Sequence, residues 1–147
     1  MLRAFDPQTD DVAILAALHA ASFTEAWSAA FIRDLFSGPG VFAFAQAEGF
    51  ILARAAGGEA EILTLTVTPK SRRQGIGRAL VRKAASHAQE LGAATLFLEV
   101  AKDNEGARKL YSGLGFKPVG LRKAYYGGTD AEVLKVVLPL PDADNFA

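Results

Sequence analysis

A glycine-containing loop flanked by basic residues carries the clearest chemical signal in this chain. The segment Arg72–Arg78 (RRQGIGR) follows a β-branched run and precedes a segment of helical periodicity. Two glycines two positions apart let a backbone turn tightly and approach a ligand closely. A helix N-terminus adds unpaired N–H groups and the positive end of the helix dipole, which suit a phosphate. The segment therefore predicts a cradle for a pyrophosphate group.

Two familiar phosphate loops do not match this segment. A Walker loop ends in Gly-Lys-Ser/Thr, whereas Gly77 is followed by Arg78 and Ala79. A dinucleotide fingerprint needs Gly or Ala three residues after its second glycine, and Leu80 occupies that position. Glu99 does stand where the ribose-binding acid of this fingerprint is expected, but the third glycine position does not match. A glycine turn without a ligand remains the alternative for the loop alone.

Glu99 is the candidate base, because it follows the apolar residues Leu96, Phe97 and Leu98 near the end of a predicted strand. Ligands of open α/β sheets bind beyond the carboxyl ends of such strands. Burial of a carboxylate without a partner raises its pKa towards the range useful for a base. Two structural alternatives stay open, namely a glutamate that reaches solvent and one that pairs with an arginine.

Several aromatic residues stand near these positions. Tyr111 lies on the next predicted helix, where a core aromatic with its hydroxyl at the rim is the ordinary interpretation. Phe23 and Trp27 flank a predicted break between two helices, where simple packing is the more common role. Tyr125 and Tyr126 precede two glycines in a predicted hairpin turn, and adjacent strand residues point to opposite faces, so at most one faces inward.

The elements that must position these residues follow from periodicity and capping. Strands are predicted at 2–5, 41–47, 50–55, 61–67, 94–100, 117–123 and 132–138. Asp10 or Asp11, Ser28, and Asp103 or Asn104 are predicted to cap three helices, and a fourth runs from Ile76 to Leu91. The run 94–100 is nearly all apolar, as expected of a strand buried on both faces. The result is a mixed α/β fold.

Composition sets the class. The 147 residues suit one domain, 1–147, and half of them are hydrophobic, which argues against disorder. The 16 basic and 16 acidic residues cancel, which argues against a general nucleic-acid-binding surface. The chain has no cysteine, so a thiolate metal site and a cysteine nucleophile are excluded, and no metal is predicted. No apolar run approaches the roughly 18 residues of a membrane span, and no signal-peptide pattern follows Met1, so a cytoplasmic protein is expected.

Taken together, these residues resemble the GCN5-related N-acetyltransferase (GNAT) superfamily and, within it, the RimI-type protein N-terminal acetyltransferases. The resemblance extends from about Leu15 to Leu138 and is strongest between Glu61 and Tyr126. The stretches that carry it are 65–67, 72–78, 96–100, Asn104, 110–116, 122–126 and 23–28.

The resemblance implies a mixed, mostly antiparallel sheet of about six to seven strands flanked by about four helices. It implies acetyl-CoA as the co-substrate, with Glu99 as general base and Tyr111 as general acid. It assigns acetyl-CoA to Leu65, Thr66, Val67, Arg72, Arg73, Gln74, Gly75, Ile76, Gly77, Arg78, Asn104 and Tyr111. It places Phe23, Trp27, Tyr125 and Tyr126 near the entry of the acceptor.

The implied activity is direct acetyl transfer to the N-terminal α-amine of a protein, with the N-terminal alanine of a small-subunit ribosomal protein as the expected acceptor. Neither nucleic acid nor membrane is an expected partner, and a monomer or weak homodimer is expected. Ala101 replaces an arginine of some relatives, and the segments 23–26 and 127–132 also depart from the family pattern. These departures fall mainly on the acceptor side.

Three alternatives remain. The enzyme could instead acetylate a small amine or a lysine side chain, or the chain could be a non-catalytic acetyl-CoA-binding module. A nucleic-acid-binding module would use the basic residues Arg72, Arg73, Arg78 and Arg82.

Overall fold

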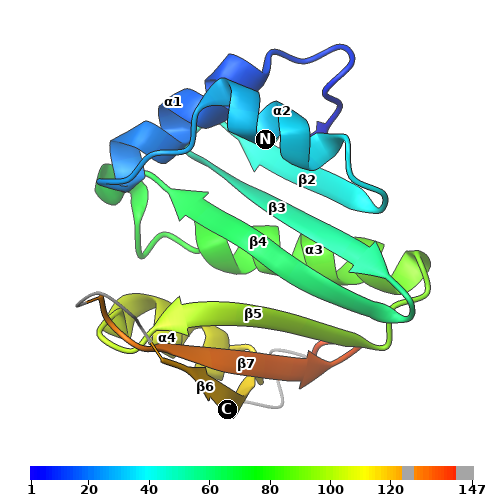
Figure 1. The fold of residues 1–147 in the computed structure, drawn as a ribbon, viewed down its shortest axis with the longest axis vertical. Helices are drawn as coiled ribbons and strands as arrows, with labels where there is room; N and C mark the ends of the chain where they lie inside the picture. Colours follow the sequence, from blue (N-terminus) through cyan, green and yellow to red (C-terminus); the bar gives the residue numbers. More distant parts are fainter. Residues whose placement is uncertain (124–127, 142–147) are drawn as a thin grey trace.

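A single mixed sheet organises the computed structural model, which describes residues 1–123 and 128–141. Its strands are β1 (Arg3–Phe5), β2 (Val41–Gln46), β3 (Gly49–Ala56), β4 (Glu59–Val67), β5 (Thr95–Ala101), β6 (Lys117–Arg122) and β7 (Ala131–Val137). Within the described residues they form a 7-stranded sheet in the order β1-β2-β3-β4-β5-β7-β6 (Figure 1). Neighbouring strands are antiparallel except β4 and β5, which are parallel. The predicted mostly antiparallel sheet is confirmed.

The helices begin where the sequence predicted. They are α1 (Val12–Ser22), α2 (Ala29–Phe36), α3 (Ile76–Glu90) and α4 (Glu105–Gly113), and a 3-10 turn, η1 (Pro69–Ser71), precedes α3. Asp11, Ser28 and Asn104 each accept a hydrogen bond from a backbone N–H in the first turn of α1, α2 and α4, respectively. These caps satisfy donors that a helix N-terminus otherwise leaves unpaired.

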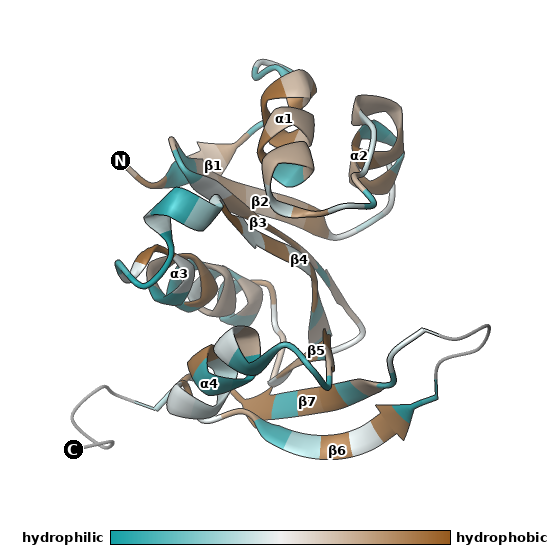
Figure 2. Ribbon diagram, turned by 90° about the vertical axis from the view of Figure 1, so that its left-hand side faces the viewer, coloured by the Kyte–Doolittle hydropathy of each residue, from teal (hydrophilic) through white to brown (hydrophobic). Residues whose placement is uncertain are grey.

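Helices cover both faces of the sheet, and each face has its own core (Figure 2). On one face α3 and α4 close a large cluster that includes the fully buried Leu80, Leu96 and Leu114. On the other face α1 and α2 close a smaller cluster around Leu15 and Ile32, packed on β2 and β3.

The second face of β5 is open, which corrects the prediction of a strand buried on both sides. Leu96, Leu98 and Val100 are buried, whereas Phe97 is half-buried and Glu99 is exposed. The reason is that α1 and α2 pack against β2, β3 and β4 and leave this face of β5 uncovered. An alternating pattern of this kind is typical of a sheet that meets the core on one face.

The sheet splits between its two central strands. β4 and β5 pair only at Glu59–Thr95, Ala60–Leu96 and Glu61–Phe97, and beyond these pairs the strands diverge (Figure 1). Just past the last pair, the register with β3 shifts so that Leu63 is an extra residue on β4, which is a β-bulge. Because bulges bend a strand and increase its twist, this one helps to turn β4 away from β5.

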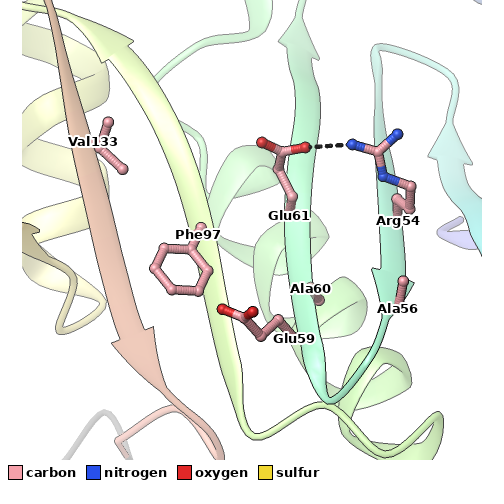
Figure 3. Close-up of a pocket in the computed structure, with 7 residues that line it drawn as sticks. All are labelled: Arg54, Ala56, Glu59, Ala60, Glu61, Phe97 and Val133. Carbon is pink, nitrogen blue, oxygen red and sulfur yellow. Dashed lines mark hydrogen bonds and ion pairs between the residues drawn. The ribbon is translucent and has the colours of Figure 1, made fainter. Parts of the chain in front are cut away.

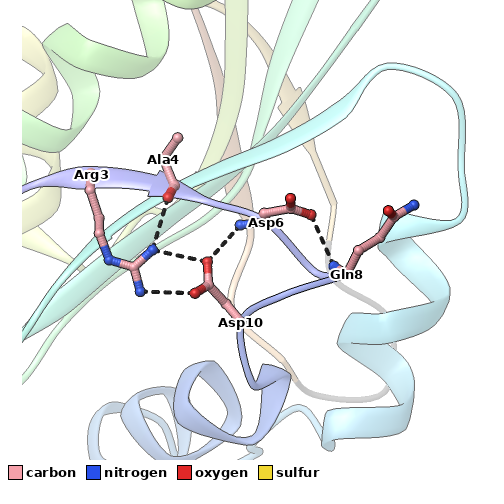
Figure 4. Close-up of polar contacts among 5 residues, drawn as sticks. All are labelled: Arg3, Ala4, Asp6, Gln8 and Asp10. Atoms are coloured by element: carbon pink, nitrogen blue, oxygen red, sulfur yellow. Dashed lines mark hydrogen bonds and ion pairs between the residues drawn. The ribbon is translucent and has the colours of Figure 1, made fainter.

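A polar network fixes the N-terminal approach to α1 (Figure 4). Arg3 of β1 donates to both carboxylate oxygens of Asp10, at 2.9 and 3.2 Å, and Asp10 also accepts the N–H of Asp6 at 2.8 Å. The hydrogen bond from Arg3 holds the pKa of Asp10 below its usual value. Among the described residues, no helix is long and apolar enough to cross a membrane.

Candidate functional site

The divergence of the two central strands leaves one edge of β4 without a partner strand. The N–H of Thr68 donates to the carbonyl oxygen of Glu48 at 2.9 Å, which directs the backbone of this position towards β3. Because backbone groups alternate in direction along a strand, Thr66 also faces β3, and Leu65 and Val67 face the gap. The side chain of Thr66 is buried, so this residue packs within the sheet and does not line the gap. An unpaired edge of this kind can take up an extended ligand as if it were another strand.

The carbonyl oxygen at the end of this edge already has two neighbours. Val67 O accepts from Arg72 Nε at 3.1 Å and from the hydroxyl of Ser22 at 3.4 Å. The first contact holds the basic loop against β4. The second is weak, because the one proton of the Ser22 hydroxyl has a closer acceptor in Leu18 O at 2.9 Å.

The basic loop turns sharply into α3, as predicted. Arg73 (φ 66°) and Gly75 (φ 82°) both adopt the left-handed conformation. Gly75 is the N-cap of α3 and offers no side chain to it, so no side-chain group occupies the first N–H groups of the helix. Such N–H groups, with the helix dipole behind them, are suited to bind an anion.

Gly77 is the point where α3, α4 and β4 meet. A Cβ atom there would lie 3.2 Å from Leu110 Cδ2, 3.6 Å from Leu65 Cδ2 and 3.8 Å from Val67 Cγ2. The missing side chain therefore allows the loop, the free edge of β4 and the helix bearing Tyr111 to come together. Of the predicted cofactor residues, the structure gathers 65–67 and 72–78 around one point.

The four cations near the loop differ in their surroundings. Lys70 Nζ lies 3.2 Å from a carboxylate oxygen of Glu48, and its hydrogen bond lowers the pKa of that carboxyl group. Arg72 is engaged by Val67, whereas Arg73 and Arg78 have no ion pair or hydrogen bond within the described residues. Arg73 and Arg78 are therefore the charges available to a ligand at this helix end.

Asn104 has a structural task as the N-cap of α4. Its side-chain oxygen accepts the N–H of Ala107 at 3.1 Å. The capping bond uses the oxygen and leaves the amide NH2 group, which can donate to a ligand.

Glu99 stands at the fork between the diverging strands, two residues beyond Phe97, the last β5 residue paired with β4. The side chain is 38% exposed and forms an ion pair with Arg122 of β6. The expectation of a buried, unpartnered carboxylate is therefore wrong, because none of the helices in residues 1–123 and 128–141 covers this face of β5. Both structural alternatives, solvent and arginine, describe its surroundings.

Tyr111 belongs to α4, and its side chain lies in the core on the other face of β5. It is 6% exposed, and its ring packs edge-on against Phe116 with centroids 5.4 Å apart. Burial raises the pKa of Tyr111, so the hydroxyl keeps its proton at neutral pH. The structure thus places Glu99 and Tyr111 on opposite sides of one strand.

An aromatic stack fills the junction of α1 and α2. The ring of His19 lies between Phe23 and Trp27, with centroids 4.4 and 4.8 Å away, and Trp27 meets Phe31 edge-on at 5.0 Å. The sequence patterns did not single out His19. Its spacing of four residues from Phe23 could have predicted that the two rings meet on one face of a helix. Tyr125 and Tyr126, the other predicted acceptor residues, lie outside the described residues.

A shallow hollow of about 350 Å³ lies where β4 and β5 are still paired (Figure 3). Its walls include Glu61 and Arg54, which form an ion pair at 2.9 Å, and Phe97. It contains none of the predicted site residues, so it is separate from the gap and the loop. Within residues 1–123 and 128–141, no cluster of three or more His, Asp or Glu side chains could hold a metal.

Comparisons with known proteins identify the family. The model of the acetyltransferase (GNAT) family matches residues 12–116. The [ribosomal protein bS18]-alanine N-acetyltransferase of Escherichia coli (strain K12) is 39% identical over 83 residues, which is 56% of this chain and 56% of that protein. The N-alpha-acetyltransferase RimI of Mycobacterium tuberculosis is 35% identical over 117 residues, covering 73% of this chain and 72% of the relative.

The fold agrees with these matches. The crystal structure of the ribosomal-protein-S18-alanine N-acetyltransferase from Escherichia coli superposes with a TM-score of 0.81 at 26% identity, over 97% of this chain and 96% of that one. The match to the curated E. coli relative itself spans just over half of that protein's length. Since the family model covers more than two thirds of the sequence and the fold is shared, the chain belongs to the acetyltransferase (GNAT) family, as its residues predicted.

Proposed function

We propose that this protein is an acetyl-CoA-dependent N-acetyltransferase that acts on the N-terminal α-amine of a protein. The observation that carries the proposal is the free edge of β4 lying beside the uncapped N-terminus of α3. This pairing suits a ligand with an extended amide-bearing arm at one end and a pyrophosphate at the other. Acetyl-CoA is such a ligand, and the family to which the chain belongs is named for acetyl transfer.

The residues fit the two parts of acetyl-CoA. The backbone groups of Leu65 and the N–H of Val67 would pair with the amides of the pantetheine arm, since the carbonyl oxygen of Val67 already accepts from Arg72. The N–H groups from Arg73 to Arg78 would hold the pyrophosphate, with the side chains of Arg73 and Arg78 adding charge. The amide NH2 of Asn104, at the start of α4, would donate to the arm.

The reaction then takes place in the gap, with its two proton transfers on opposite faces of β5. The acceptor α-amine, whose pKa is about 8 in the free state, loses a proton to Glu99 directly or through water. Its nitrogen attacks the thioester carbonyl, and backbone N–H groups of β4 can stabilise the oxyanion. The C–N bond forms, the C–S bond breaks, and the hydroxyl of Tyr111 protonates the departing thiolate. Tyr111 recovers its proton from solvent, so no acyl-enzyme is required.

The acceptor would approach on the side of Glu99. The helices α1 and α2, with Phe23 and Trp27 at their junction, cover this same side of the sheet. Tyr125 and Tyr126 would complete the entry by the family resemblance. One relative is named for alanine acetylation of ribosomal protein bS18, and another is named as an N-alpha-acetyltransferase. We therefore propose the N-terminal alanine of a ribosomal protein as the acceptor, and the cytoplasm as the location of the reaction.

The test is CoA release from acetyl-CoA with a panel of acceptors. The panel contains free N-terminal peptides that begin with Ala, Ser or Met, the same peptides with blocked N-termini and an internal lysine, and small amines. Turnover confined to free N-termini, fastest with Ala, is the expected result. Turnover only on lysine or on small amines would overturn the acceptor, and acetyl-CoA binding with no turnover on any acceptor would favour a non-catalytic module.

A further inference from the structure

His19 is a buried polar residue at the centre of the α1–α2 junction. Its side chain is 3% exposed, and its Nδ1 atom accepts the backbone N–H of Trp27 at 3.0 Å. Its ring is stacked between those of Phe23 and Trp27. Because Nδ1 accepts a hydrogen bond, the ring is neutral and carries its proton on Nε2.

The segment 24–27 depends on this contact. It is neither helix nor strand, and within the described residues its one hydrogen bond is that from Trp27 to His19. Phe23 is 42% exposed, so the stack reaches from the core to the surface. One residue before it, the hydroxyl of Ser22 contacts the carbonyl oxygen of Val67 on the free edge of β4. The junction is thus fixed by His19 on one side and joined to the acetyl-CoA edge on the other.

We infer that His19 is a positioning residue of the acceptor site, which holds Phe23 and Trp27 in place through its Nδ1 acceptor and the stacking surface of its ring. The inference rests on the proposed function, because it requires that these two aromatics meet the acceptor. It assigns His19 no contact with the reacting atoms.

This arrangement makes acceptor binding sensitive to acid. Burial lowers the pKa of His19, and a proton at Nδ1 would abolish its ability to accept from Trp27. The charged side chains on the packed elements are Glu25 in the linker, Arg33 and Asp34 on α2, and Arg54, Glu59 and Glu61 on β3 and β4. None of them forms an ion pair or hydrogen bond with His19, so desolvation of the ring decides its charge.

Two substitutions separate the two contributions. His19→Phe keeps an aromatic ring but removes the acceptor. We expect the KM for a peptide acceptor to rise about tenfold, because the part-buried N–H of Trp27 loses its partner. His19→Asn supplies an oxygen close to the position of Nδ1 without a titrating group, so it should recover part of that loss. It should also remove the further fall of kcat/KM that protonation of His19 causes in acid, and leave the limb that the acceptor amine itself imposes. Acetyl-CoA affinity should stay within about twofold in both. The control is His87→Asn, since the sequence has 2 histidines and His87 lies on α3, away from the junction.

A readout independent of activity uses Trp27, the single tryptophan of the chain. Fluorescence of the wild type should change as pH falls through the lowered pKa of the stacked ring, with no such change in His19→Asn and a wild-type titration in His87→Asn. If His19→Phe shifts the KM values for acceptor and acetyl-CoA equally, or if the fluorescence titration survives in His19→Asn, the positioning role is wrong. If the fluorescence behaves as expected but no free N-terminus is acetylated, the proposed function fails and the His19–Trp27 coupling stands.

Discussion

Residue chemistry alone does not distinguish the proposed base from its neighbours. Glu99 and Glu61 are both glutamates on central strands, similarly exposed (38% and 41%), and each is paired with an arginine. The difference is position, because Glu61 lies where β4 and β5 are still paired and Glu99 lies just past the point where they part. The ion pair with Arg122 also means that an acceptor amine competes with a guanidinium for the carboxylate.

Glu99→Gln and Glu61→Gln therefore form a matched pair for the catalytic role. We expect Glu99→Gln to lower kcat by about 100-fold or more, since loss of a general base costs 10²–10⁴-fold, while the Kd for acetyl-CoA is unchanged. Glu61→Gln should retain full turnover. Stopped assays of CoA release and calorimetric titration of acetyl-CoA would measure both quantities. Equal losses in the two variants would show that the glutamates act only through the sheet.

Tyr111 gives a prediction in which stability and catalysis are separable. Its folded-state pKa is raised by burial, so its contribution to stability is fully present below the unfolded value of about 10 and is lost as pH rises beyond it. Urea unfolding of the wild type at pH 8 and at pH 10.5 should show this alkaline loss. Tyr111→Phe should show less of it and a reduced kcat at both pH values. A variant with normal turnover would remove the general-acid role and leave a core aromatic.

At the level of elements, the sequence predicted the features that depend on neighbouring residues, such as helix caps and turns. It did not predict those that depend on tertiary packing. The caps Asp11, Ser28 and Asn104, and the turn at Gly75, follow from side-chain and backbone preferences that the sequence states directly. The separation of β4 from β5 depends on a bulge and on strand pairing, which no local pattern encodes. The sequence left burial and exposure of Glu99 both open for the same reason, because its exposure depends on how far α1 and α2 extend over the sheet.

The glycine loop yields a test of two different constraints on one element. Gly75 has a left-handed φ of 82°, and a Cβ added there would meet nothing within 4 Å. A Cβ added at Gly77 would lie 3.2 Å from Leu110 Cδ2, which is a crowded position. Ala has no polar group that could cap the first N–H groups of α3, and its left-handed strain of roughly 1–2 kcal/mol falls on the folded state with and without ligand. Gly75→Ala should therefore keep acetyl-CoA affinity within about threefold. Gly77→Ala would force the side chain of Leu110 on α4 to shift, and it should weaken acetyl-CoA by about tenfold. Calorimetric titration decides it, and the opposite ranking would place the constraint in the backbone angle instead of the close approach.

For the whole molecule, the hydrophobic core joins the two halves of the split sheet. β1–β4 and β5–β7 share three residue pairs in the described structure, but they also share one hydrophobic core. That core contains Ile51 from the first half, Leu96 and Leu134 from the second, and Leu80 of α3, which packs between them. The backbone edge of β4 can therefore stay open for a ligand without dividing the protein into two folding units.

This view predicts how acetyl-CoA should affect folding. A ligand that pairs with β4 and also binds the N-terminus of α3 recognises only the folded state, so at 100 times its Kd it should stabilise the protein by about 2.7 kcal/mol. Unfolding followed by fluorescence and by circular dichroism should remain one transition that shifts as a whole, because the shared core couples both halves. Acetyl-pantetheine and ADP, tested separately at equal concentration, should each give a smaller shift, since each engages only the edge or only the cradle. A shift from ADP as large as that from acetyl-CoA would mean that the free edge of β4 contributes nothing to binding, and the gap would then lose its place in the proposed reaction.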